Sequence, residues 1–253
     1  MRLEQRPGLT APVLPEAPLG AGNSLATLFG ATAGHWPTPL RPATHASLLW
    51  LNSRAAALDP ACQALGGNMT AYAAHLLSCC AWLVDDEPSA IRSKAAAMGH
   101  ADRYGGSGVG NNGGSGRSVV VNGYLVKGAG RTGLVSALTP ASHASGGAYL
   151  EEAVREVIFS EVVAAEFPHS AVPVLALIDT GLVQRWNLDH GPASERRVLV
   201  VRPCVLRAAH FERSVGFQSG QSCEGLRDTE RVRRMFALAA DQLGAAELEG
   251  AFI

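Results

Sequence analysis

The sequence predicts an α+β protein in which an antiparallel sheet carries a packed helix and a helical segment precedes the sheet. Three observations lead to this fold class. The pair Asn122-Gly123 separates two short β-branched runs, which is the strongest short-range signal for a β-hairpin. One amphipathic helix is predicted from about Tyr149 to Phe167. Further β-branched segments follow it and are expected to add antiparallel strands.

The composition is that of an ordinary soluble globular protein. Of the 253 residues, 47% are apolar and 17% are charged, which is enough to bury a core. The formal net charge of −1 gives no global attraction to nucleic acid or to anionic membranes, so neither is expected as a partner. No apolar run is long enough to span a membrane or to form a signal peptide, so a cytoplasmic location is expected. The five cysteines and eight histidines show no metal-binding spacing.

The first hundred residues divide into an arm and a helical segment. Seven of the fourteen prolines lie within residues 1–42, and proline is excluded from regular helices and from central strands. Residues 1–45 are therefore predicted to form an extended arm. Residues 46–100 are predicted to be helical, with one packing helix over residues 46–65 and another from Met69 to Val84, because their apolar residues recur at nearly helical spacing.

The stretch from Tyr104 to Leu134 is the most informative part of the chain. Seven of the twelve residues from Gly105 to Gly116 are glycine, so this loop exposes its backbone and packs no core of its own. The hairpin that follows ends at Lys127, next to a second glycine turn at Gly128-Ala129-Gly130. Backbone N–H groups beside a fixed cation are the chemistry of phosphate binding. A flexible linker is the alternative interpretation of such a glycine cluster.

The second half of the chain is predicted to add one helix, three strands and a final helix. A set of apolar residues in the first helix falls on one face and is expected to pack on the core. These residues are Leu150, Ala153, Val154, Val157, Ile158, Val162 and Val163. A hairpin is predicted from Val172 to Trp186 with its turn at Asp179-Thr180-Gly181. Residues 196–202 are expected to form a buried strand, and Asp228 to Leu243 an amphipathic helix.

This order of elements is the layout of a protein-kinase small lobe. There a strand lysine holds the ATP phosphates, and a glutamate from the next helix holds the lysine. A buried ammonium group needs such a carboxylate, because alone it would be costly to bury and free to move. Lys127 and Glu156 fit the two roles, with Glu152 and Glu161 as competitors for the second. The alternative is that these glutamates form a solvated helix face.

Six short motifs, spread over about residues 36–243, share one resemblance. They are Pro37-Thr-Pro-Leu40, Asn52 with Ala55, Ala56 and Leu58, Tyr104-Gly-Gly with Gly116-Arg117, Leu125-Val-Lys-Gly-Ala-Gly-Arg-Thr132, Val154-Arg-Glu156 with Ser160-Glu161, and Arg207-Ala-Ala-His-Phe-Glu212. Together they resemble the selenoprotein O family, which consists of pseudokinase-fold protein adenylyltransferases. The block from Lys127 to Thr132 is the most specific of the six.

The resemblance implies a substrate and a set of contacts. ATP would be bound in an inverted orientation, and AMP rather than phosphate would pass to Ser, Thr or Tyr hydroxyl groups of a protein or peptide substrate. Lys127 would contact phosphate and Glu156 would be its helix partner. The remaining nucleotide contacts implied by the resemblance are Gly113, Gly114, Gly116, Arg117, Gly128 and Arg207.

The sequence also departs from the family pattern. Its glycine loop is shorter, and Ser115 replaces the aspartate that precedes Gly-Arg. Residues 101–225 are expected to form the kinase-like nucleotide-binding lobe, and residues 226–253 a helix that leads toward a large catalytic lobe missing from the chain. The Mg²⁺ ligands are expected in that lobe or in a second polypeptide. The chain is therefore predicted to be the ATP-binding half of an AMP-transferring enzyme. A non-catalytic nucleotide- or partner-binding accessory module of a peptide- or protein-modifying system, and a kinase-like phosphotransferase, are the alternatives.

Overall fold

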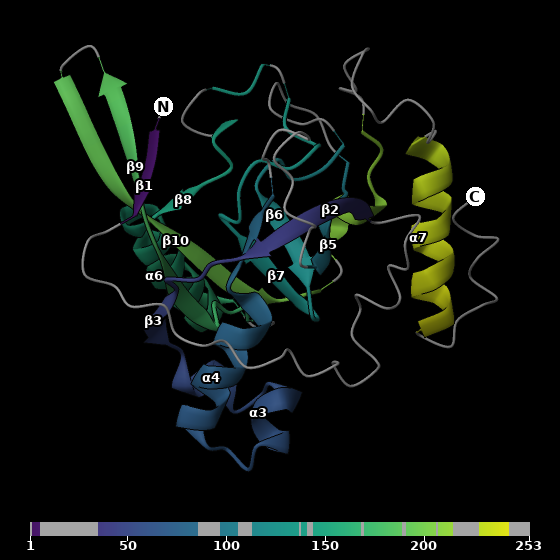
Figure 1. Cartoon of the computed structure of the whole chain (residues 1–253). Helices are drawn as coiled ribbons and strands as arrows, with labels where there is room; N and C mark the ends of the chain where they lie inside the picture. The colour runs from purple at the N-terminus through teal and green to yellow at the C-terminus, as the bar shows by residue number, and fades with distance from the viewer. Residues whose placement is uncertain are drawn as a thin grey trace.

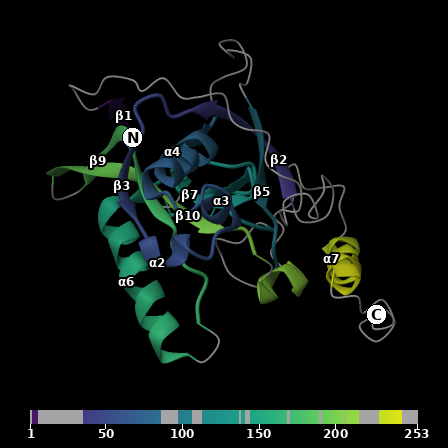
Figure 2. The same cartoon turned by 90° about the horizontal axis from the view of Figure 1, so that it is seen from below.

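The computed structural model describes residues 2–5, 35–85, 97–105, 113–136, 138–140, 144–167, 170–188, 191–205, 207–214 and 228–242. This part of the chain is an α+β fold, a curled antiparallel sheet with a few helices (Figures 1 and 2). No helix in the described ranges is both long enough and apolar enough to cross a membrane.

The sheet runs in the order β1-β9-β10-β7-β6-β5-β2-β4, with β3 paired to β9 and β8 paired to β10. The strands are β1 (Arg2–Gln5), β2 (His35–Pro42), β3 (Ser47–Leu51), β4 (Trp82–Val84), β5 (Ala97–Asp102), β6 (Ser118–Val121), β7 (Tyr124–Lys127), β8 (Ala148–Tyr149), β9 (Ala176–Leu188) and β10 (Gly191–Pro203). The helices are α2 (Ser53–Ala56), α3 (Pro60–Ala64), α4 (Met69–Cys80), α6 (Leu150–Glu166), the 3-10 helix η1 (Ala208–Phe211) and α7 (Asp228–Gln242).

The predicted hairpin is confirmed as β6 and β7. Its two turn residues, Asn122 with φ 49° and Gly123 with φ 84°, both adopt the left-handed conformation that a two-residue type I′ turn requires. The Asn122 side chain also donates a hydrogen bond of 3.0 Å to the carbonyl oxygen of Cys79. The turn therefore fixes the register of the hairpin and ties it to α4.

The predicted buried strand is confirmed as part of β10, which is covered on both faces. Successive side chains of a strand point to opposite faces. Leu199 and Val201 pack in the main core, to which α4 contributes. Val198 and Val200 pack with α6 in a second cluster. The α4 and α6 helices therefore cover opposite faces of the sheet, and β10 lies between them.

The prediction that the prolines keep residues 35–42 out of the sheet is wrong. This segment is β2, which pairs with β5 on one side and with β4 on the other. The carbonyl oxygen of Pro39 accepts a hydrogen bond of 2.9 Å from the N–H of Asp85, which follows the last residue of β4. Pro39 has no N–H to donate to β4, but β4 has already ended at this point. Pro42 pairs with β4 but lies beyond the pairing with β5, which begins at Leu40. The missing N–H groups thus fall at the ends of the neighbouring strands, where a proline interrupts little of the ladder.

The predicted helices of residues 46–65 and 69–84 are only partly confirmed. Ser47–Leu51 is strand β3, paired with β9, and the helical part is limited to the short α2 and α3. The second helix exists as α4, but it ends at Cys80 and the chain continues as strand β4. Short apolar runs fit a helix and a buried strand equally well, so periodicity alone does not decide between them.

The predicted turn at Asp179-Thr180-Gly181 is wrong, because these residues lie inside the long strand β9. Asp179 is fully buried, accepts a hydrogen bond of 2.9 Å from the N–H of Gly181, and forms an ion pair with Arg196. The pairing of β9 with β10 shifts its register between Arg196 and Val198. The polar residues that resemble a turn in sequence therefore accompany an irregularity within a sheet. The connection that follows Leu188 lies outside the described residues.

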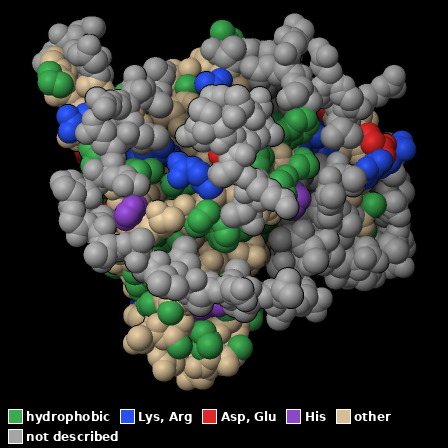
Figure 3. All heavy atoms as spheres, viewed as in Figure 1, with side chains coloured by type: hydrophobic (Ala, Val, Ile, Leu, Met, Phe, Trp, Pro, Cys, Tyr) green, Lys and Arg blue, Asp and Glu red, His purple; other side chains and the backbone are tan. Residues whose placement is uncertain are grey.

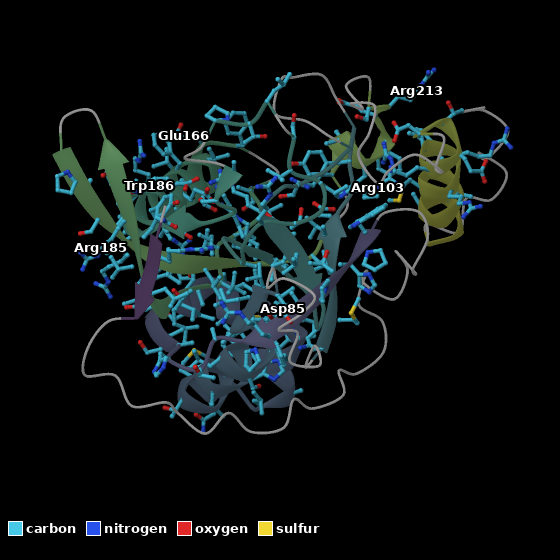
Figure 4. All side chains as sticks on the ribbon, turned by 45° about the horizontal axis from the view of Figure 1, so that its top comes forward. Asp85, Arg103, Glu166, Arg185, Trp186 and Arg213 are labelled. Carbon is cyan, nitrogen blue, oxygen red and sulfur yellow. The ribbon has the colours of Figure 1, made fainter. Side chains whose placement is uncertain are left out.

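The two amphipathic helices are confirmed as α6 and α7. Arg231 of α7 is buried, donates a hydrogen bond of 2.7 Å to the carbonyl oxygen of His210, and forms an ion pair of 2.8 Å with Asp228. Figure 4 shows Arg103 between the sheet and α7, and its guanidinium lies 3.8 Å from Asp228. Buried arginines therefore attach α7 to η1 and to the end of β5.

The orientation predicted for α6 is only partly confirmed. Of the seven residues expected to face the core, Ala153 is buried and Leu150 and Val157 pack against the same cluster, while the other four are exposed. The side of α6 that faces the sheet carries two glutamates, Glu152 and Glu156, which pair with cations on the sheet and its adjoining loop. Six large apolar side chains on the outer side of α6 remain exposed, with exposed fractions between 38% and 65%. They are Val154, Ile158, Phe159, Val162, Val163 and Phe167.

Candidate functional site

Lys127 stands at the end of β7, on the face of the sheet that α6 covers. It pairs across strands with Val200, which belongs to the cluster packed against α6. Its Nζ lies 2.8 Å from Glu152 Oε1 and also forms an ion pair with Glu156 Oε1. The predicted contact between Lys127 and Glu156 is therefore present, and Glu152 shares the same ammonium group.

Two arginines extend this pair into a larger group, which we name the Lys127 cluster: Arg117, Lys127, Glu152, Glu156 and Arg202. Arg117 Nη2 lies 2.9 Å from Glu152 Oε1, and Arg202 Nη2 lies 3.4 Å from Glu156 Oε2. All five side chains are between 20% and 26% exposed. Three cations and two carboxylates leave a net charge of +1. A partly dehydrated site with excess positive charge suits an anionic ligand.

The described basic residues lie in separate groups on one face of the molecule, the face drawn in Figure 3. The excess charge of the Lys127 cluster is therefore a local property of the site, in a chain whose overall charge is −1.

Glu152, which contacts both Arg117 and Lys127, has a shifted pKa. Burial raises the pKa of this carboxyl group, but the hydrogen bond from Lys127 and the charges of Arg117 and Lys127 outweigh burial. The net result is a pKa below the usual value for glutamate. The carboxylate form of Glu152 is thus held by the two neighbouring cations.

This shift predicts a loss of stability in acid. A carboxyl group with a lowered pKa in the folded state binds protons more readily in the unfolded chain, so its contribution is present above its usual pKa and disappears as the pH falls through the folded pKa. In the Glu152→Gln variant the thermal midpoint should therefore fall less than in the wild type when the pH is lowered from about 6 to about 3. Glu151→Gln, at an exposed neighbouring position of α6, is the matched control and should keep the wild-type slope. Equal slopes for the wild type and Glu152→Gln would contradict the assignment.

Glu161, the other predicted competitor, has a different place. It accepts a hydrogen bond of 2.8 Å from the amide of Asn52, whose own side-chain oxygen caps α2 through the N–H of Ala55. It also lies 3.5 Å from Arg54. Glu161 therefore connects α6 to α2 and takes no part in holding Lys127.

The predicted glycine contacts are packed into the protein where the structure describes them. Gly113 and Gly114 are buried, and a Cβ atom added at Gly114 would lie 2.3 Å from the carbonyl oxygen of Asp102. A Cβ atom at Gly116 would meet Val135 at 3.0 Å. The N–H of Ser115 already donates to the carbonyl oxygen of Asp102 at 2.8 Å. These glycines allow a close approach of backbones, and residues 106–112 of the loop lie outside the described residues.

Gly128 is also used within the protein. Its N–H donates a hydrogen bond of 2.8 Å to the carbonyl oxygen of Arg117, and its own carbonyl oxygen accepts one of 3.0 Å from Arg197 Nη2. Its φ of +95° lies in the region that favours glycine. The backbone conformation required next to Lys127 therefore accounts for a glycine at position 128.

Arg207 belongs to a second polar group, away from Lys127. Its guanidinium forms an ion pair with Asp102 and lies 5.0 Å from the centre of the Tyr104 ring. Asp102 Oδ1 also lies 2.8 Å from Nε2 of the buried His210, whose Nδ1 accepts a hydrogen bond from the N–H of Arg207. His210 thus donates to Asp102 through Nε2. The segment from Gly113 to Arg117 runs from this group to the Lys127 cluster.

Sequence reasoning missed two members of these groups. Arg202 was expected only as the last residue of the buried strand 196–202, yet its alternation with Val198 and Val200 places it on the face that α6 covers. Asp102 had no signal in the sequence, because its partners Arg207 and His210 are more than a hundred residues away. The position of Arg202 could have been predicted from strand periodicity, whereas that of Asp102 could not.

Among the described residues, no group of three or more His, Cys, Asp or Glu side chains is placed to hold a metal ion. Comparison of the sequence with models of known protein families and with curated protein sequences found no match.

Proposed function

We propose that this chain is the ATP-binding half of a protein adenylyltransferase-like pseudokinase, which needs a second lobe or a partner chain for activity. The observation that carries the proposal is the ammonium group of Lys127, held between a strand and a helix by Glu152 and Glu156. In kinase-like folds this ion pair is what sets the lysine against the nucleotide phosphates.

The order of the surrounding elements supports the same reading. Strand β5 is followed by the glycine-rich segment, then by the β6–β7 hairpin that ends at Lys127, then by α6 with its glutamates, and finally by β9 and β10. Strand, glycine loop, strand, lysine strand and glutamate helix is the sequence of parts in a kinase small lobe.

The Lys127 cluster can bind a phosphate group by charge. An ammonium group has three hydrogen-bond donors, and two of those on Lys127 are directed at Glu152 and Glu156. The third can donate to a phosphate oxygen, and Arg117 adds a second cation beside it. We assign to Lys127 the phosphate contact and to Glu156 the role of its positioning residue.

Transfer of AMP rather than phosphate follows from the motif resemblance centred on Lys127 to Thr132. The described residues supply no Mg²⁺ site, so they do not fit the metal that nucleotidyl transfer uses. The metal ligands would have to come from the second lobe, and no chemical step is assigned to this chain alone.

A nucleotide- or partner-binding accessory module is the second candidate, and one observation favours it. Ser115 and Gly128 have their backbone N–H groups bonded within the protein, which leaves a smaller phosphate cradle than a loop of open N–H groups would. Such a module would bind nucleotide without catalysis. A kinase-like phosphotransferase would use the same cluster and differs only in the group that it transfers.

Calorimetric titration of the full chain with ATP tests the binding function. We expect saturable binding both with and without Mg²⁺, because the contacts are made by cationic side chains. Absence of binding at millimolar ATP would remove the proposed function, since the Lys127 cluster would then be only a structural ion network.

Labelled ATP separates the three functions. The chain, supplied with a candidate second lobe and a protein substrate, is incubated with ATP labelled at the α or at the γ phosphate. We expect protein-bound label from the α position only. Label from the γ position would identify a phosphotransferase, and binding without transfer of either label would identify the accessory module.

A further inference from the structure

Among the described residues, six of the eleven exposed large apolar side chains lie on the outer side of α6 or at its C-terminal cap. Helix α6 lies at the edge of the molecule, with its long axis along the surface (Figure 2). The six exposed apolar side chains named above all lie on it or at its C-terminal cap, Phe167. A patch of this kind on one helix is typical of an interaction surface.

The exposed residues form two parallel rows, each with a spacing of four. The first row is Val154, Ile158, Val162 and Glu166, and the second row is Arg155, Phe159, Val163 and Phe167. All eight are exposed. Residues four apart are neighbours on a helix, so each row is a ridge, and neighbouring ridges of this kind interdigitate between packed helices.

These rows are complementary to themselves. Rotation about a two-fold axis at the midpoint between Ser160 and Glu161 places the first row of one helix against the second row of an antiparallel copy. The resulting pairs are Val154 with Phe167, Ile158 with Val163, Phe159 with Val162, and Glu166 with Arg155. Every apolar side chain thus meets an apolar one, and every charged side chain meets its opposite. A symmetric interface requires this reciprocity.

We propose that the chain forms a two-fold symmetric dimer through the outer face of α6, with a second copy of itself as the occupant. From the exposed fractions and usual side-chain areas, each copy contributes on the order of 500 Å² of apolar surface. The pair would bury about 1,000 Å², which is near the lower limit for a specific interface and predicts a weak dimer.

The dimer is independent of the proposed function but lies next to its site. Glu152 and Glu156 face the sheet from the inner side of the same helix. Docking a second copy on the outer side leaves the Lys127 cluster accessible and adds support to the helix that holds it.

Sedimentation equilibrium of the full chain over a wide concentration range tests the proposal. We expect a concentration-dependent monomer–dimer equilibrium in the wild type. Ile158→Glu should weaken dimerisation by about a hundredfold or more, because it places two carboxylates in the apolar contact. Leu58→Glu changes an apolar residue that is 79% exposed but lies off α6, and it should leave the equilibrium unchanged.

Charge reversal tests the register. Arg155→Glu and Glu166→Arg should each weaken the dimer by about tenfold. Because the dimer is two-fold symmetric, either substitution replaces both Arg155–Glu166 pairs with pairs of like charge. The double variant restores both pairs and should return to within about threefold of the wild type. A wild type that stays monomeric at all concentrations would overturn the proposal. So would a dimer that survives Ile158→Glu, or a double variant no stronger than the single ones. All of these positions are exposed, and thermal unfolding checks that each variant is folded.

Discussion

Replacing Lys127 with alanine is expected to weaken ATP binding by about a hundredfold or more. The change removes the ammonium group that is proposed to contact phosphate, and it leaves Glu152 and Glu156 without the cation that they share. The net charge of the Lys127 cluster would fall from +1 to zero, with two carboxylates left beside the ligand site, so the attraction for phosphate is lost. Calorimetric titration of the wild type and of Lys127→Ala with ATP measures the difference.

Two further variants make this result specific. Lys127→Met keeps the apolar stem and removes only the charge, so it should lose affinity to a similar extent. Arg54→Ala removes an arginine that is 89% exposed and pairs with Glu161, outside the cluster, and it should bind ATP as the wild type does. Wild-type affinity in both Lys127 variants would remove the phosphate role.

Replacing Gly128 with alanine is expected to lower the free energy of unfolding by about 3 kcal/mol or more. An added Cβ would lie 2.5 Å from the carbonyl oxygen of Val198 and 2.7 Å from the Cβ of Ala148, and φ of +95° is unfavourable for alanine. Both contacts are with the sheet itself, so the neighbours cannot move away cheaply. Denaturant unfolding of the two proteins gives the difference.

Gly191 provides the matched control. It also has a positive φ, of +113°, but a Cβ added there meets nothing within 4 Å. Gly191→Ala should therefore lower the free energy of unfolding by only about 1 kcal/mol, the cost of placing alanine at a positive φ. If Gly128→Ala unfolds like the wild type yet no longer binds ATP, Gly128 is a nucleotide contact and its packing role is wrong.

Features that depend on residues close together in the chain were predictable from the sequence. Asn122-Gly123 specifies its turn by backbone conformation, and α7 follows from its apolar spacing. The pairing of Lys127 with Glu156 was also predictable, because an ammonium group that ends a strand below a packed helix needs a carboxylate from that helix. The sequence could not tell that Glu152 would share the lysine.

Features that depend on distant partners were not predictable. Residues 47–51 have an apolar pattern that fits a helix as well as a strand, and only pairing with β9 makes them a strand. Asp179 resembles a turn residue until Arg196 is placed beside it in the sheet. Proline is compatible with β2 only because the neighbouring strands end where its N–H groups are missing.

The sequence by itself determined that a helix follows the hairpin, since seventeen residues of α6 carry an amphipathic pattern without proline. Only the tertiary structure decided which side of that helix faces inward. The sheet and its adjoining loop present Arg117, Lys127 and Arg202 there, and partly buried cations require carboxylates, so Glu152 and Glu156 turn inward and the apolar rows turn outward. The side of α6 that faces inward is determined by cations that lie outside the helix, and the apolar periodicity of the helix carries no information about them.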